Sequence, residues 1–173
     1  MSGTSGSITE RLPIRHGAIV GAGGWIVGIV VSYALAQAAG VSGSAVLGVS
    51  VLDLSIVFYF MLHLWPLVLA PGTDMATAAL MFTPIAVAIL MVGGYRVASH
   101  ADNAESGFRN GATATVGYFV LAVLSLLFAL GSVTQFLFQQ ATGRTIVVVL
   151  FTGVLVPVVF GGLGGAIADW RSD

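Results

Sequence analysis

Two ionisable side chains lie inside one apolar stretch of this chain, at about residues 46–69. They are Asp53 and His63. Tyr59 precedes His63 by four residues, so the two side chains share a helix face and could hydrogen-bond. Ionisable groups within an apolar span are expensive and usually serve a function. We therefore take Asp53, Tyr59 and His63 as candidates for a proton relay or a transport site.

Each of these residues also has a structural interpretation. Near a helix end, Asp53 would bond to Ser50 or Ser55, and a neutral His63 would be satisfied by a neighbouring helix. Asp53 and His63 are separated by about 15 Å along a helix axis. They therefore cannot touch, although a water-filled path could include both.

Other reactive chemistry finds little support. The chain has no Cys, which excludes disulfides, zinc–thiolate sites and iron–sulfur clusters. We expect His16 and His100 near span ends on opposite faces of the membrane and His63 in mid-span, so no two match in depth to hold haem. The acids are scattered, and no nucleophile–base pair can be assembled. We expect no catalytic residue, no metal ligand and no cofactor, and an enzyme ranks last among the functions.

Composition places these residues in a membrane protein. Hydrophobic residues make up 57% of the chain and charged residues 8%, whereas soluble domains have about 25% charged residues. Most of the surface must therefore face lipid. The net charge of −1, without a basic stripe, argues against nucleic-acid binding.

Charged residues and turns divide the chain into continuous apolar stretches, each with about the 20 residues that a helix needs to cross a bilayer. Stretches of this length without alternation indicate helices and not barrel strands. We predict an all-α, polytopic transmembrane helical bundle with about five spans, near residues 17–39, 46–69, 76–98, 112–138 and 145–168. A short polar segment, 1–16, precedes this single domain, 17–168, and a polar tail, 169–173, follows it.

The six basic residues, all Arg, do not settle the orientation of five spans. The two sides would hold equal numbers, with Arg11, Arg15 and Arg144 on one and Arg96, Arg109 and Arg171 on the other. Because the first helix often dominates the positive-inside rule, we expect a cytoplasmic N-terminus and an external C-terminus.

Small residues recur at steps of three or four in several spans, which aligns them on one helix face. Helices in lipid pack where such residues let backbones approach closely. The helix-packing or partner-interface candidates in the first and fifth spans are Gly17, Gly21, Gly24, Gly28, Gly153, Gly161 and Gly165. These faces either pack within one bundle or dock another membrane subunit or a second copy.

Three segments carry a family resemblance: residues 59–63 (Tyr-Phe-Met-Leu-His), residues 107–111 leading to Gly117 and Tyr118, and the Pro-to-Gly run 157–165. Through them the chain resembles an uncharacterised family of small haloarchaeal multi-pass membrane proteins, some of which are labelled as transporters. The absence of Lys fits a salt-adapted source. The resemblance implies a location in the cell membrane and brings no established activity.

Two functions follow from these observations. The first is a non-catalytic subunit that packs into a larger membrane complex or a homo-oligomer, supported by the small-residue faces and by the shortage of buried ionisable groups. The alternative is a small transporter or channel with Asp53 and His63 on the permeation path. In both, the expected partners are the lipid bilayer and another membrane subunit or a second copy.

Overall fold

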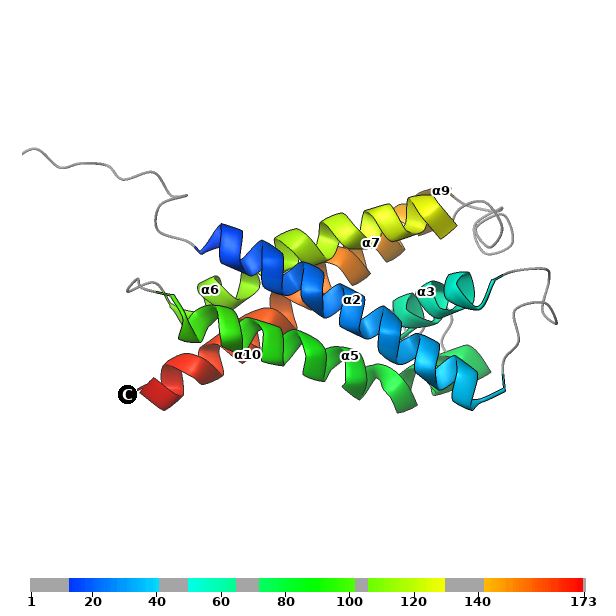
Figure 1. The fold of residues 1–173 in the computed structure, drawn as a ribbon, viewed down its shortest axis with the longest axis horizontal. Helices are drawn as coiled ribbons and strands as arrows, with labels where there is room; N and C mark the ends of the chain where they lie inside the picture. The colour runs from blue at the N-terminus through cyan, green and yellow to red at the C-terminus, as the bar shows by residue number, and fades with distance from the viewer. Residues whose placement is uncertain (1–12, 41–49, 65–71, 102–105, 130–141, 173) are drawn as a thin grey trace, which may run out of the picture.

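The computed structural model describes residues 13–40, 50–64, 72–101, 106–129 and 142–172, and all regular structure in these ranges is helical. Figure 1 shows the helices arranged as one bundle with its long axis horizontal. The elements are α2 (Ile14–Ala38), α3 (Val51–Met61), α5 (Asp74–Ser99), α6 (Gly107–Ala112), α7 (Thr115–Ala129), α9 (Thr142–Leu150), the π-helical segment η2 (Phe151–Leu155) and α10 (Val156–Ser172). The predicted all-α fold is confirmed.

Four of the described helical stretches are long and apolar enough to cross a membrane. They comprise α2, most of α5, α6 with α7, and α9 through α10, over Ile14–Ala38, Leu80–Ser99, Gly107–Phe128 and Ile146–Arg171. Each has the roughly 20 residues that a hydrocarbon core requires. The protein is therefore a polytopic transmembrane helical bundle.

Helix α3 is too short to make the crossing expected near residues 46–69. Its 11 residues extend for about 16 Å, roughly half of a ~30 Å hydrocarbon core. At its start, the Ser50 hydroxyl accepts from the Asp53 N–H and donates to the Asp53 carboxylate, at 3.1 and 2.6 Å. Beyond its end, Leu64 has a φ of 65°, the left-handed conformation that terminates helices. Local structure at both ends thus fixes a half-length helix, with Asp53 in its first turn.

The fourth span also differs from its prediction near residues 112–138. It begins at Gly107, and a turn divides it into α6 and α7, where the Thr113 hydroxyl donates to the Asn110 carbonyl. Residues 130–138 lie outside the described ranges. In the last span, η2 ends two residues before Pro157, whose ring has no N–H to donate to the Gly153 carbonyl. Helix α10 continues through the segment predicted as a polar tail as far as Ser172.

The chain begins and ends its crossings on the same side of the membrane. The rings of His16, in the first turn of α2, and His100, after the last turn of α5, lie 5.8 Å apart between centroids. At this same end the Gly107 N–H, at the start of α6, donates to the Asp169 carboxylate near the end of α10. Figure 1 accordingly shows the start of α2 and the C-terminus on the same side. The expectation that His16 and His100 lie on opposite faces is wrong, because α3 does not cross.

Four crossings also change the distribution of positive charge. Among the described residues, four Arg belong to the end that holds the start of α2, namely Arg15, Arg96, Arg109 and Arg171, and Arg144, near the start of α9, belongs to the other. The two sides of the membrane therefore no longer hold equal numbers of Arg, as they would with five spans. Arg residues concentrate on the cytoplasmic side of membrane proteins. With both ends of the bundle on one side, the positive-inside rule predicts that the two ends lie in the cytoplasm, whereas five spans predict an external C-terminus.

Helices α2 and α7 approach closely through glycines on both sides. A Cβ on Gly21 would overlap the backbone carbonyl of Ala114, and a Cβ on Gly117 would overlap that of Ala18. Backbones at this separation gain van der Waals contact that lipid cannot replace. The α2–α7 pair is therefore held by backbone packing.

The other glycines predicted to pack on α2 have different surroundings. A Cβ on Gly17 would overlap the turn before α7, and one on Gly28 would overlap the ring of Tyr59. Gly24 lies at the edge of this contact, where a Cβ would meet Ile89 at an ordinary 3.4 Å. The buried face of α2 thus includes Gly17, Gly21 and Gly28, with Gly24 outside the tight contact.

The glycines of the last span face other helices of the same chain. A Cβ on Gly165 would overlap the carbonyl of Gly107 in α6, and one on Gly161 would lie 3.1 Å from the carbonyl of Gly111. Gly153, in η2, packs against an aromatic ring of α7. In the described part of the chain, these three residues are therefore buried by internal packing.

The four-crossing topology predicts where single cysteines are labelled. Because the chain has no Cys, Arg15→Cys, Asp74→Cys and Arg171→Cys each introduce one thiol at an exposed position. A membrane-impermeant maleimide should label Arg15→Cys and Arg171→Cys from the same side, and Asp74→Cys only from the other. Labelling of Arg15→Cys and Arg171→Cys from opposite sides would mean an odd number of crossings.

Glycine packing predicts opposite effects for neighbouring substitutions in α2. Gly21→Ala should lower the free energy of unfolding by about 1–3 kcal/mol, because its Cβ must displace the α7 backbone. Gly23 has no atom within 4 Å of an added Cβ, so Gly23→Ala is the matched control. It should leave stability unchanged or raise it by up to about 1 kcal/mol through helix propensity. Unfolding in mixed detergent micelles measures both, and equal effects would refute the close contact.

Candidate functional site

The end of α3 holds a buried cluster of hydrogen-bonding side chains. His63, Tyr59 and Tyr118 are each 0% exposed. The Nε2 of His63 lies 2.5 Å from the Tyr118 hydroxyl, which in turn lies 2.6 Å from the Tyr59 hydroxyl. The Nδ1 of His63 lies 2.8 Å from the backbone carbonyl of Tyr59. We call His63, Tyr118 and Tyr59 the triad.

The triad lies deep within the hydrocarbon region. Tyr118 is near the middle of the span Gly107–Phe128, and Trp25, which contacts all three rings, is near the middle of α2. The half-length of α3 is what brings its C-terminal residues to this depth. The triad is therefore a polar site at about the centre of the bilayer.

The local sequence explains how the rings fit together. Gly28 leaves the space on α2 that the ring of Tyr59 occupies. Trp25 packs edge-on against Tyr59 and Tyr118 at centroid distances of 5.0 and 4.9 Å. The indole N–H of Trp25 donates to the Ser125 hydroxyl at 2.8 Å, which ties α2 to α7 beside the triad. Aromatic packing and one interhelical hydrogen bond thus hold the rings in position.

The triad has a role in the structure of α3 itself. A helix ends with backbone carbonyls that lack intrahelical partners, and in lipid these must be satisfied by other protein groups. The Nδ1–H of His63 donates to the Tyr59 carbonyl, which also accepts from the Leu62 N–H at 3.1 Å, so the ring adds a second hydrogen bond at the end of α3. Because a carbonyl only accepts, Nδ1 must carry a proton. The other ring nitrogen, Nε2, then decides the charge of the ring.

Two arrangements of hydrogen satisfy the triad, and they differ by one proton. With a neutral ring, Nε2 accepts from Tyr118 and Tyr59 donates to Tyr118, which is the reverse of the direction in the structure, where the Tyr118 hydroxyl donates to the Tyr59 hydroxyl. If a proton reaches the Tyr59 oxygen, each hydroxyl passes its own proton along, so that Nε2 becomes protonated and Tyr118 donates to Tyr59. No heavy atom has to move between the two arrangements. The triad can therefore carry a proton from the Tyr59 hydroxyl to the ring of His63.

Comparison with known proteins gives a family but no activity. The family described as "family of unknown function (DUF7978)" matches residues 65–172, more than half of the chain. The chain belongs to this family. No curated protein and no solved structure matches it.

The DUF7978 match covers only part of the site. It includes Tyr118 and Ser125 but begins just after His63, so α3 lies outside it. Of the segments that carry the sequence resemblance, 107–111 and 157–165 fall inside the matched region and 59–63 does not. The family match therefore covers the α5–α10 part of the bundle. Tyr59 and His63, at the end of α3, pack against this part and contact its Tyr118.

The structure brings together two of the three sequence-predicted candidates. Tyr59 and His63 meet in the triad, whereas Asp53 lies in the first turn of α3, bonded to Ser50. The sequence did not indicate the role of Tyr118, because its contact with His63 joins residues 55 apart in the chain. The one available signal was its place among small residues in the fourth span, where a large hydroxylated ring stands out.

The described residues of this DUF7978 protein include no group of three or more His, Asp or Glu side chains that could hold a metal ion. Both ring nitrogens of His63 are already engaged, one by a carbonyl and one by a hydroxyl. The arrangement is thus suited to holding and passing a proton.

Removal of the central hydroxyl should weaken the site. Tyr118→Phe leaves both Nε2 of His63 and the Tyr59 hydroxyl without the partner that now joins them. We expect the free energy of unfolding in mixed micelles to fall by about 1–2 kcal/mol. Tyr33→Phe is the matched control, since the Tyr33 hydroxyl bonds only to the exposed Gln37 amide in the described structure and its loss should change stability little. Equal stabilities of the two variants would contradict the hydrogen bonds assigned to the triad.

Proposed function

We propose that this protein is a small transporter or channel of the cell membrane that moves protons, alone or coupled to another solute. The observation that carries the proposal is the triad itself, a His and two Tyr joined by hydrogen bonds at half-depth on the end of a half-length helix. The absence of Lys and the family resemblance support a salt-adapted archaeon as the source.

The position of the triad supports transport over a purely structural role. Buried hydrogen-bonded polar groups in a membrane cost more to assemble than the apolar packing that would serve a scaffold. Transporters often bind their substrates near the bilayer centre, at the ends of helices that do not cross completely. Helix α3 resembles these helices, because it crosses only half of the bilayer and the titratable ring of His63 lies at its end. The triad is therefore the proposed proton-binding site.

The direction of α3 suggests the route to the triad. Its first turn, with Asp53, lies at the Arg-poor end of the bundle, where α2 ends and α5 begins. Between Asp53 and Tyr59, the hydroxyl of Ser55 is buried and bonds to the Val51 carbonyl. On α2, Ser32 is fully buried two turns beyond Trp25, and its hydroxyl has no hydrogen-bond partner among the described residues. We propose that protons enter past Asp53 along these polar groups to the hydroxyl of Tyr59.

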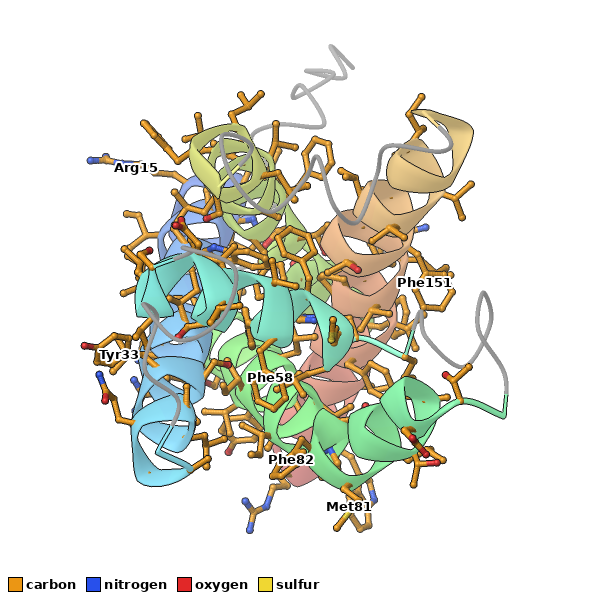
Figure 2. All side chains as sticks on the ribbon, turned by 90° about the vertical axis from the view of Figure 1, so that its right-hand side faces the viewer. Arg15, Tyr33, Phe58, Met81, Phe82 and Phe151 are labelled. Atoms are coloured by element: carbon orange, nitrogen blue, oxygen red, sulfur yellow. The ribbon has the colours of Figure 1, made fainter. Side chains whose placement is uncertain are left out.

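A second candidate function, a subunit of a larger complex or homo-oligomer, is favoured by a different observation. An apolar hollow of about 700 Å³ lies between α2, α3 and α5, where Leu35, Phe58 and Phe82 line it. Figure 2 shows Phe58 pointing from α3 toward Phe82 on α5 at this end of the bundle. Because α3 fills only half of the bilayer depth, a helix of another subunit or a second copy would complete the packing there.

Flux in liposomes tests the proposed transport. Purified protein would be reconstituted with an internal pH-sensitive dye, and a potassium gradient with valinomycin would drive protons across the bilayer, at low and at high salt. We expect the internal pH to change faster in liposomes with the wild-type protein than in empty liposomes. His63→Gln and Tyr118→Phe should lower the rate at least about tenfold, since each removes one proton-passing group from the relay.

Two controls make this result interpretable. Tyr33→Phe, which changes a Tyr hydroxyl outside the triad, should retain the wild-type rate. The amount of folded protein in the liposomes should be equal for all variants. Wild-type flux no faster than that of empty liposomes would refute the proposal, and co-purification of a stoichiometric membrane protein would then favour the subunit function.

A further inference from the structure

We propose that the cytoplasmic end of α5 binds an anionic two-chain phospholipid, with the lipid phosphate on Arg96 and the acyl chains in the grooves on either side of the helix. This site is separate from the triad and does not depend on the proposed transport. It rests on two grooves and on the one charged side chain that lines both.

The larger groove runs between α2 and α5. Its volume is about 470 Å³, within the range of roughly 300–1,000 Å³ that ligand pockets occupy. Val27 and Val92 on its sides are both more than half exposed, and its floor includes Gly23, next to which nothing lies within 4 Å of a Cβ position. Except at Arg96, its lining is apolar, so the groove suits a hydrocarbon chain.

The smaller groove lies on the other side of α5, between α5 and α10. Its volume is about 280 Å³, and its lining includes Tyr95, Gly164 and Ile167. Val92 and Arg96 line both grooves, so the two grooves meet on the lipid-facing ridge of α5. A molecule with two hydrocarbon chains and one anionic group between them matches this arrangement.

The location of Arg96 suits a lipid headgroup. Arg96 lies in the last turn of α5, at the Arg-rich end that the positive-inside rule assigns to the cytoplasm. Basic residues between transmembrane helices on that side are typical sites for anionic headgroups. A guanidinium also binds phosphate in a bidentate manner. In a zwitterionic headgroup, the lipid's own cation competes with the guanidinium for the phosphate, so binding is weaker. The chemistry therefore selects an anionic phospholipid.

The test uses the full-length protein in zwitterionic detergent, with phosphatidylglycerol, phosphatidylcholine or glycerol phosphate added. Native mass spectrometry would count bound lipid, and the unfolding temperature would report its effect. We expect phosphatidylglycerol to bind and to raise the unfolding temperature more than phosphatidylcholine does. Arg96→Gln should weaken phosphatidylglycerol binding about fivefold and remove most of the preference over phosphatidylcholine.

Variants of the groove separate a lipid from a free phosphate. Gly23→Leu would fill the larger groove without an internal clash, and it should reduce lipid binding while Arg96 stays in place. The controls are Arg171→Gln, which removes an exposed charge at the same end, and Ile26→Phe, which enlarges an exposed side chain outside both grooves.

The proposal is overturned by any of three results. These are equal binding of the two lipids, an Arg96→Gln variant that binds like Arg171→Gln, and a stabilisation by glycerol phosphate as large as that by phosphatidylglycerol. The last result would mean that the grooves contribute nothing to lipid binding. Reduced binding in Arg96→Gln and Gly23→Leu, with both controls unchanged, would support the two-part site.

Discussion

The structure depends on the requirement that every backbone polar group within a bilayer be paired inside the protein. Helices that cross completely meet this requirement at their water-exposed ends, but α3 ends in the hydrocarbon region. Its final carbonyls need partners there, and the Tyr59 carbonyl accepts both from the Leu62 N–H and from the ring of His63. The remaining ring nitrogen needs a partner in turn, which is the Tyr118 hydroxyl of α7. The capping of one short helix thus creates the triad.

Close backbone packing makes this arrangement possible. Glycines in α2 and α7 bring the two helices near enough for Trp25 and Ser125 to bond beside the triad. Glycines in α6 and α10 likewise let these two helices of the matched family region pack closely. Gly23, by contrast, faces a groove on the lipid side, so one helix uses small residues for internal packing on one face and leaves space on another. The fold and its external grooves therefore arise from the same sequence feature.

Much of the fold could be predicted from the sequence because lipid imposes simple rules of length and polarity. The helical class and the positions of α2, α5 and the last span followed from apolar length. The number of crossings did not, since the stretch 46–69 is long enough to span and only the Ser50 cap and the backbone at Leu64 shorten α3. That one difference caused the errors in the sides assigned to His100 and to the C-terminus.

The candidate site could be predicted only in part. The four-residue spacing of Tyr59 and His63 is a local signal, and the two rings lie 4.9 Å apart between centroids although His63 follows the last residue of α3. For Asp53 the sequence left two interpretations open, and the structure matches the one in which it lies near the helix start and bonds to Ser50. Tyr118 completes the site through a tertiary contact, which helical periodicity does not report.

Solid-state NMR of the protein with ¹⁵N-labelled His rings in liposomes tests the central claim most directly, because only three His contribute signals. We expect a neutral His63 ring with a proton on Nδ1 and a hydrogen-bonded, unprotonated Nε2. We also expect that Tyr118→Phe shifts the Nε2 signal of His63 while the signals of His16 and His100 stay unchanged. A His63 ring with its proton on Nε2, or one that is insensitive to Tyr118→Phe, would contradict the triad as the cap and proton site of α3.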